Sequence, residues 1–365
     1  MNNVLQFHNI QLEILSPVHI GDGSTISKKE YFYDKLNQKI KVFDIPALFS
    51  IFTKKGITAE NEMTGYLLDN SNSDVLSRLL KKYSINANEY LRYELDTSEG
   101  NDDYLKKREI NSFVKDPYGL PYIPGSTIKG LLKSAIISYK IHSDADLCRT
   151  MKAGIKEAIR TGGAKKQALA RDVNARIEAV FDKKVDDKNS IKGFSGLIVS
   201  DSRPVTDKNP LILAQKVDYS LEKRKGSLPI YKESLRPGIK VDSSLTLDTK
   251  TLNISVNYIK EALDFYQKEA YRYFYSEYGR GEDSSNIVWL GGGAGFISKT
   301  VIYQLFGKDA YEICNDIFLK TLGEKTYRKH KHDEYHDEMT PHTCKCTIYN
   351  DELFDMGKAR LLFLN

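Results

Sequence analysis

A proline- and glycine-rich run ahead of a helical stretch combines residue types that bind phosphate. Residues 121–130 read PYIPGSTIKG, and Lys133 follows. Prolines stiffen the approach, and Gly125 lets the backbone turn tightly where the helix begins. The N–H groups of a first helical turn, at the positive end of the helix dipole, favour an anion. We therefore predict a phosphate site whose candidates are Gly125, Ser126, Thr127, Lys129 and Lys133. The alternative is a capped helix with an ordinary lysine stripe.

A second glycine-rich run lies in the other half of the chain, where residues 290–300 read LGGGAGFISKT. Four glycines within five positions cost considerable backbone entropy, so we expect them to let the backbone approach a ligand closely. The positive charge of Lys299 would assist. The candidates are Gly291, Gly292, Gly293, Gly295 and Lys299, and the alternative is a flexible loop.

The second run nearly matches two nucleotide-binding motifs. Gly293 and the pair Lys299-Thr300 fit G-x-x-x-x-G-K-[ST], but Ser298 stands at the second glycine. The strand that could hold magnesium, residues 197–201, lies far upstream, and repeated βαβ alternation is lacking. A P-loop-like NTPase therefore remains an alternative. The dinucleotide fingerprint fails because Phe296 replaces its last glycine.

Neither a catalytic set nor a metal site emerges from the remaining polar residues. His19 near Asp22 has the residue types of a base and its orienting group, but a histidine in a glycine-containing loop more often binds backbone, phosphate or a base. Histidines and cysteines gather near the end of the chain, yet their spacing lacks paired zinc motifs. These residues are His330, His332, His336, His342, Cys344 and Cys346. We assign no metal and no cofactor, and we place Cys344 and Cys346 on one face of a strand.

Length, net charge and composition limit the class of protein to which these loops belong. A chain of 365 residues is long enough for two domains, and its net charge of +5 is compatible with nucleic acid. Residues 151–190 carry ten Lys/Arg against six Asp/Glu, a net +4; such a run is more often a solvated face. The longest apolar runs fall short of the ~20 residues of a membrane helix. With four scattered cysteines and no secretory signal, we expect a cytoplasmic protein without a membrane partner.

Strand and helix patterns alternate irregularly and predict an α+β fold. Ser126 is the expected N-cap of the first convincing helix, and another helix is expected from Ile297. Expected strands are 10–14, 30–34, 39–44, 90–96, 110–115, 197–200, 214–219, 229–234, 239–247, 287–290, 343–349 and 358–364, and the other expected helices are 60–69, 75–83, 151–181 and 256–278. Each half has a glycine-rich loop that leads into a helix, which predicts domains at 1–190 and 191–365. The basic helical stretch at about 146–190 is predicted to be an insertion.

The order of several motifs resembles the RAMP superfamily of CRISPR proteins. SPVHIG at 16–21 resembles the start of such a protein, YIPGSTIKG at 122–130 its first glycine motif, and GGGAGF at 291–296 its second. Glu233 with RPG at 236–238, PHT at 341–343 and MG at 356–357 also fit. Together they span nearly the whole chain and favour the filament-capping subunits of type III-A (Csm) effector complexes.

The resemblance implies two ferredoxin-like, RRM-related domains with helical insertions. It also implies a non-catalytic subunit that binds the guide RNA (crRNA) at its 3′ end, contacts neighbouring RAMP backbone subunits and supports trimming by host exonucleases. His19, Gly21 and the two glycine motifs would contact the RNA backbone, independently of sequence; Lys299 is added for its charge and position alone.

The chain departs from the target-cutting paralogue of the same superfamily. That paralogue carries an aspartate after its first strand, ahead of a V-x-R-D-P-like run, whereas residues 28–34 here read KKEYFYD. Asp22 and Asp34 are therefore poor nuclease candidates. The rival within the superfamily is a metal-independent endoribonuclease that uses His19.

Overall fold

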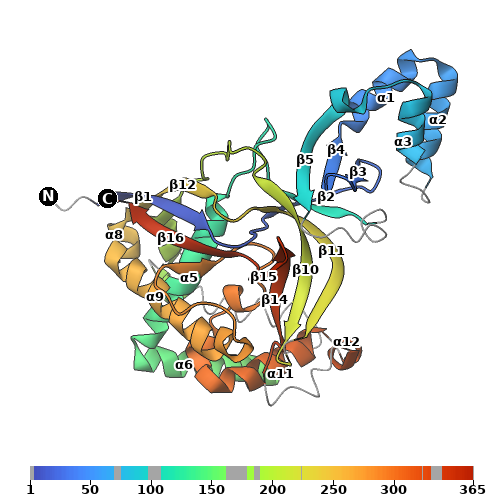
Figure 1. Cartoon of the computed structure of the whole chain (residues 1–365). Coiled ribbons are helices and arrows are strands. Elements are labelled where there is room, and N and C mark those ends of the chain that lie inside the picture. Colours follow the sequence, from blue (N-terminus) through green and yellow to red (C-terminus); the bar gives the residue numbers. More distant parts are fainter. Residues whose placement is uncertain are drawn as a thin grey trace.

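The computed structural model describes residues 4–69, 75–97, 108–161, 179–184, 190–222, 224–322, 324–329 and 339–364. Helices and strands are mixed along the chain, and most strands belong to two sheets (Figure 1). The α+β class predicted from the sequence is confirmed. Among the described residues, no helix is both long and apolar enough to span a membrane.

The first sheet has five antiparallel strands in the order β13-β16-β1-β12-β9. An alternation of apolar and polar residues explains β1, because Ile10, Leu12 and Ile14 are buried while the residues between them are more exposed. The strands are β1 (Leu5–Ile14), β9 (Leu197–Val199), β12 (Lys240–Asp248), β13 (Ile287–Trp289) and β16 (Lys358–Leu364). Helices α5 (Gly125–His142) and α9 (Val256–Tyr273) pack against each other and contact β9 and β13 respectively.

The path of the chain through this sheet combines both predicted halves. In chain order the elements run β1-α5-β9-β12-α9-β16, while in space the strands lie as β16-β1-β12-β9. Strand β1 therefore lies between two strands that follow residue 190. Strands from both sides of residue 190, the end of the first predicted domain, therefore occur in each of the two sheets.

The second sheet has nine strands along the path β2-β6-β11-β10-β5-β4-β3, with β14 beside β10 and β15 beside β14. Its centre is the long hairpin of β10 and β11, whose register shifts between Gln215 and Val217. The strands are β2 (Gly21–Ile26), β3 (Tyr31–Asp34), β4 (Lys39–Phe43), β5 (Leu91–Thr97), β6 (Ile110–Phe113), β10 (Leu211–Ser220), β11 (Lys225–Leu235), β14 (Thr343–Tyr349) and β15 (Glu352–Asp355). The predicted strand at 343–349 is confirmed as β14, and the one at 358–364 is confirmed as β16 of the first sheet. Strand β15 was not predicted.

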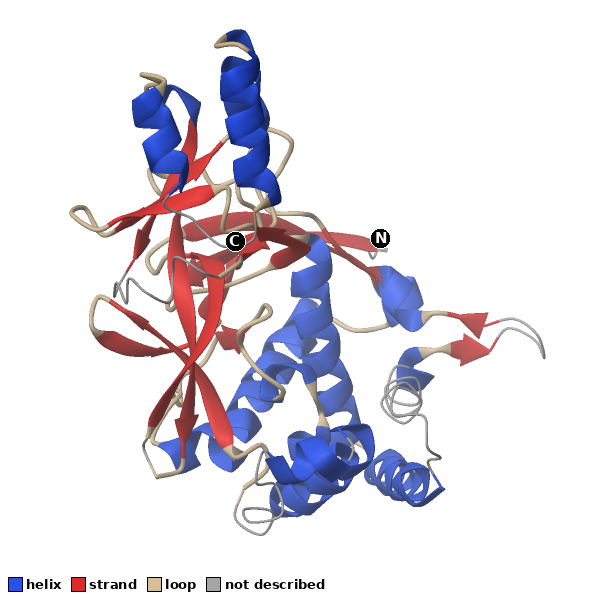
Figure 2. Ribbon diagram, turned by 90° about the vertical axis from the view of Figure 1, so that its right-hand side faces the viewer, coloured by secondary structure: helices blue, strands red, loops and turns tan. Residues whose placement is uncertain are grey.

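A small helical module has its own core beside the β3–β5 strands. It comprises α1 (Ile45–Lys54), α2 (Ile57–Leu68) and α3 (Val75–Lys82). Asp44 caps α1 by accepting a hydrogen bond from the Ala47 amide, and Pro46 lies in the first turn, where a proline is tolerated. Figure 2 shows this module at one end of the molecule and a second group of helices at the other, with strands between them.

The second group of helices surrounds α5 and α9. It includes α6 (Ala145–Thr161), α8 (Thr249–Leu252), α10 (Ile302–Phe306), α11 (Ala310–Leu322) and α12 (Glu324–Lys329). Strands β7 (Lys183–Lys184) and β8 (Ser190–Ile191) form a separate pair. The predicted basic insertion begins as a helix, α6, and its residues 162–178 and 185–189 lie outside the described residues.

Three local predictions were wrong. Pro124, not Ser126, is the N-cap of α5, because the chain reaches the helix directly from a proline. The residues that follow His19 in the expected glycine-containing loop belong to β2, which pairs with β6. The helix expected from Ile297 is only a short 3₁₀ turn, Ile297–Lys299, before the five-residue α10.

Candidate nucleic-acid interface

The two glycine-rich loops meet at one groove. Its volume is about 460 Å³, and it lies between the start of α5, the start of β2 and the loop after β13. The residues that line it are Ile20, Gly21, Ser126, Thr127, Gly130, Leu131, Ser134, Trp289, Leu290, Gly291, Gly292, Ser298 and Lys299. The structure therefore brings together six predicted residues from three separate segments: Gly21, Ser126, Thr127, Gly291, Gly292 and Lys299.

The glycine loop after β13 is held by the loop that precedes β2. The Gly292 amide donates a hydrogen bond of 2.8 Å to the His19 carbonyl oxygen. A Cβ added at Gly291 would lie 2.1 Å from that oxygen, and Gly291 has a φ of 84°. Only glycine fits there, because both the close approach and the positive φ exclude a side chain. The backbone approach that we predicted toward a ligand is here an approach to protein backbone.

Two further glycines of this loop also have structural reasons. A Cβ at Gly293 would lie 2.3 Å from the Met356 sulfur, and Gly295 has a φ of 84°. Gly292 differs, because it is exposed, lines the groove and has no positive φ. Among the four predicted glycines, Gly292 is the one that is exposed at the groove and whose φ does not require glycine.

The N-terminus of α5 is already contacted by a carboxylate. The Gly125 amide donates a hydrogen bond of 2.7 Å to Asp201 Oδ1, and a Cβ on Gly125 would lie 2.2 Å from the Val199 carbonyl oxygen. Gly125 is thus required for packing against β9. Asp201 provides the negative charge that the helix dipole favours, at the position we predicted for a phosphate. Only the side of the first turn that carries Ser126 and Thr127 faces the groove.

Lys129 and Lys133 lie four residues apart on α5 and flank the groove without lining it. Burial, and next the charge of Lys133, lower the pKa of Lys129. Lys133 Nζ lies 5.3 Å from the centre of the Phe194 ring. Both lysines therefore add positive charge to the part of α5 beside the groove.

His19 is buried, with 4% of its surface exposed. Its Nδ1 lies 2.6 Å from the Glu233 carbonyl oxygen, and burial lowers its pKa to about 4. The Glu233 carboxylate is buried too, and it accepts hydrogen bonds from the Phe113 amide and Lys115 Nζ. His19 thus positions the Gly291–Gly292 backbone, while its imidazole is not open to a substrate.

Sequence analysis missed three lysines that stand near the glycine loop. Lys232 Nζ lies 3.3 Å from the Gly292 carbonyl oxygen, and burial, then Lys216 and Lys299, lower its pKa. Lys345 contacts the position where a Gly295 side chain would lie. These lysines come from β11, β10 and β14. Their gathering depends on strand pairing between distant segments, so local sequence patterns gave no signal for it.

The second loop does not have the geometry of a P-loop. A P-loop places its lysine and Ser/Thr at the start of a helix that follows a strand. Here the strand β13 is followed by a 3₁₀ turn that ends at Lys299, and Thr300 is buried. The P-loop alternative is therefore not supported.

The predicted cysteine face is confirmed, since Cys344 and Cys346 are both fully buried on one side of β14. His330, His332 and His336 lie outside the described residues. His342 is described and immediately precedes β14.

Comparison with known proteins defines the class. The model of the RAMP superfamily matches residues 11–298, and the chain belongs to this superfamily. It is similar to the CRISPR system Cms protein Csm5 of Streptococcus thermophilus, at 25% identity over 84% of this chain and 83% of the relative. The protein of the same name from Mycobacterium tuberculosis (strain CDC 1551 / Oshkosh) is 26% identical over 99% of this chain and 98% of its own length.

Two solved structures share the fold. One is a chain of a Csm–crRNA–target RNA ternary complex of a type III-A CRISPR-Cas system, with a TM-score of 0.69, 21% identity and coverage of 98% of this chain and 100% of that one. The other is Csm5 of T. onnurineus, with a TM-score of 0.61, 18% identity and coverage of 96% and 99%.

Proposed function

We propose that this chain is a non-catalytic, guide-RNA-binding subunit of a type III-A Csm effector complex. In that role it caps the backbone filament at the 3′ end of the crRNA. The observation that carries the proposal is the groove between the two glycine-rich loops, in a RAMP-superfamily chain whose curated relatives are named Csm5. A similar chain has been solved in a complex with crRNA.

The groove suits an RNA backbone. Ser126 and Thr127 offer hydroxyl groups, Gly292 leaves room for close approach, and the exposed Lys299 offers a positive charge. Lys129 and Lys133 extend that charge along α5. Contacts of this kind fix the position of a strand without reading its bases, which suits guides of varying sequence.

The burial of His19 supports the proposed binding role rather than catalysis. A general base must reach the proton that it removes, within about 3 Å or through one water. The His19 imidazole is buried and its Nδ1 is engaged by Glu233. We therefore favour the binding subunit over the metal-independent endoribonuclease.

We further propose that the first sheet is a ferredoxin-like domain and that the second sheet belongs to a divergent RAMP domain. The succession β1-α5-β9-β12-α9-β16 is a βαββαβ unit, the pattern of ferredoxin-like folds. In this proposal the capping of the filament depends on contacts with neighbouring RAMP subunits. The chain acts in the cytoplasm, and trimming of the crRNA 3′ end by host exonucleases stops where the complex protects it.

The test is to purify the tagged chain from its native host and to sequence the RNA that accompanies it. We expect RNAs of one length class that carry CRISPR repeat and spacer sequence, together with the other subunits of the complex. A matched purification of the Lys129→Glu/Lys133→Glu variant should recover less of this RNA. Recovery of the chain alone, without RNA or partner subunits, would overturn the proposal.

The maturation role has a separate readout. In cells that lack this chain, crRNA 3′ ends should be heterogeneous or longer, and expression of the chain should restore the normal length class. Unchanged 3′ ends would contradict a role in maturation while leaving RNA binding intact.

A further inference from the structure

Two cysteines and one aspartate form a buried cluster away from the groove. Cys344 and Cys346 lie on the same face of β14, and Asp355 of β15 pairs directly with Cys346. Their sulfur and carboxylate oxygen atoms all lie within 4.8 Å of one another. The exposed fractions are 0%, 0% and 4%, so the cluster is closed to solvent.

These three donors have the chemistry of a zinc site. Thiolates and carboxylates are common zinc ligands, with Zn–S distances of about 2.3 Å. Two thiolates of a tetrahedral zinc ion therefore lie roughly 3.8 Å apart. Atoms within 4.8 Å of one another reach that geometry by small side-chain rotations.

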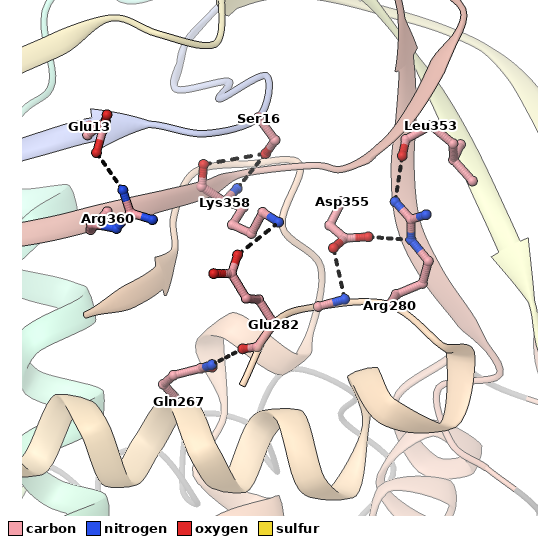
Figure 3. Close-up of polar contacts among 10 residues, drawn as sticks. Glu13, Ser16, Gln267, Arg280, Glu282, Leu353, Asp355, Lys358 and Arg360 are labelled. Carbon is pink, nitrogen blue, oxygen red and sulfur yellow. Dashed lines mark hydrogen bonds and ion pairs between the residues drawn. The ribbon is translucent and has the colours of Figure 1, made fainter. Parts of the chain in front are cut away.

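The surroundings of Asp355 resemble the outer support of a metal ligand. Arg280 Nε donates a hydrogen bond of 2.6 Å to Asp355 Oδ1, and the Gly281 amide donates one of 2.9 Å to Oδ2 (Figure 3). Both bonds fix the orientation of the carboxylate, and each oxygen keeps a second lone pair. The Arg280 guanidinium also donates to the Leu353 carbonyl oxygen, so it is itself held in place.

The charge balance of the cluster favours a divalent cation. With both thiols protonated, Arg280 and Asp355 neutralise each other. If both thiols lose their protons to one divalent cation, the net charge of the cluster does not change. A single buried thiolate would be costly without such a partner.

We propose that Cys344, Cys346 and Asp355 bind a structural zinc ion. Thiolate donors favour zinc over magnesium or calcium, which prefer oxygen. The fourth position of the tetrahedron remains for a water molecule. The ion would join β14 to β15 next to Met356 and Gly357.

This placement would connect the zinc ion to the glycine loop. Gly357 accepts a hydrogen bond of 2.9 Å from the Leu290 amide, and the Met356 side chain packs where Gly293 lacks a Cβ. A metal that fixes the pairing of Cys346 with Asp355 would therefore stabilise the segment that holds Leu290, a residue lining the groove. The inference stands independently of the proposed function, because it rests on β14, β15 and Arg280.

The test measures metal on the full chain after removal of any histidine tag. Elemental analysis of protein produced in zinc-supplemented medium should find about one zinc ion per chain. Replacement of zinc by cobalt should produce thiolate-to-cobalt charge-transfer absorption. The variant Cys148→Ser/Cys314→Ser keeps only the two proposed cysteines, so both signals should persist in it.

Single substitutions assign the ligands. Cys344→Ser or Cys346→Ser should lower the metal affinity at least about tenfold, whereas Cys314→Ser, at another buried cysteine, should not. The triple variant His330→Ala/His332→Ala/His336→Ala should also keep the metal. Circular dichroism checks that each variant folds.

Three outcomes would overturn the proposal. These are wild-type protein without zinc and without cobalt charge transfer, metal retained after both cysteines are replaced, and metal lost only from the histidine variant. If the Cys344 and Cys346 variants fail to fold, the zinc content of the wild type and of Cys148→Ser/Cys314→Ser still tests the proposal.

Discussion

The carbonyl oxygen of His19 accepts the amide proton of Gly292 over 2.8 Å. This single bond joins the loop before β2 to the glycine loop after β13. Ile20 and Gly292, which the bond brings together, line the groove, and a side chain at Gly291 would collide with the accepting oxygen. The shape of the groove thus depends on two segments that are distant in sequence.

Reversal of the α5 charges should weaken RNA binding without regard to sequence. For Lys129→Glu/Lys133→Glu we expect a loss on the order of tenfold or more, similar for unrelated RNAs, because phosphate contacts carry no base information. Fluorescence anisotropy with several single-stranded RNAs measures it. Lys54→Glu/Lys55→Glu, in the separate helical module, is the matched control. A loss confined to one RNA sequence would contradict backbone binding.

Salt should weaken binding steeply. Each phosphate neutralised in a single strand contributes about −0.7 to the slope of log affinity against log salt concentration. The wild-type slope should therefore be clearly negative, and Lys299→Ala should make it shallower by roughly one contact. The measurement is a titration at several salt concentrations. A flat response would show that the groove does not bind phosphates.

Alanine substitutions at two neighbouring glycines should affect different properties, RNA affinity at Gly292 and stability at Gly293. A Cβ at Gly292 would lie 3.3 Å from His19 Cδ2 and 3.7 Å from Lys232 Nζ, a tight fit that a small shift can relieve. Gly292→Ala should therefore fold with a modest loss of stability and should lower RNA affinity by taking up space beside Lys232. A Cβ at Gly293 would meet the buried Met356, so Gly293→Ala should lose about 1–3 kcal/mol of stability. Urea unfolding and RNA titration of both variants separate the effects. Unchanged RNA affinity in Gly292→Ala would give its loop a purely structural role.

Acid should destabilise the fold through His19. Its pKa is about 4 when folded, against 6.5 ordinarily, so the unfolded chain binds the proton first as the pH falls. The stability that the neutral imidazole contributes is complete above pH 6.5 and is lost toward pH 4. Linkage sets this loss at up to about 3 kcal/mol, about 2 kcal/mol of it between pH 7 and pH 5.

The matched variant for this pH effect is His19→Asn, which retains a side-chain N–H donor and does not titrate. Urea unfolding at pH 7 and pH 5 should show a smaller loss of stability for the variant than for the wild type. Equal losses would mean that other groups account for the acid sensitivity.

Removal of the Asp201 carboxylate should destabilise the start of α5. Asp201→Ala leaves the Gly125 amide without its acceptor, and loss of such a cap costs about 0.5–2 kcal/mol. Thermal unfolding measures this cost. Asp207→Ala, in the same connecting segment, should be nearly neutral; an equal effect of both variants would argue against a specific capping role for Asp201.

Local patterns predicted much of the secondary structure. Alternating apolar residues located β1, and the spacing of Ile128, Leu132 and Ala135 located α5. These predictions succeed because burial of one face imposes a period of two or 3.6 residues on the sequence. An RNA-contacting role for the two glycine motifs was inferred from a family resemblance. Their meeting at one groove was not predicted and is seen only in the structure.

The remaining features depend on contacts that local patterns do not contain. Asp201 reaches the α5 N-terminus from 76 positions away, and Lys232 reaches Gly292 from another strand. The glycines of the second loop were predicted to approach a ligand. In the structure, Gly291 makes room for the His19 carbonyl oxygen and Gly293 makes room for the Met356 side chain. A sequence pattern indicates that a backbone must come close to something, without indicating whether that partner is a ligand or the protein.

The pairing of β1 with β16 has a consequence for biosynthesis. Glu13 and Arg360 form an ion pair across these strands, although 347 positions separate them. While the ribosome is still translating the intervening segments, β1 has no strand at the edge where β16 will pair. Its apolar face therefore stays exposed until later segments have been synthesised. Contacts this distant slow folding and expose intermediates to aggregation. The nascent chain is therefore expected to engage chaperones until β16 emerges, so that abundance in the cell depends on how quickly translation is completed.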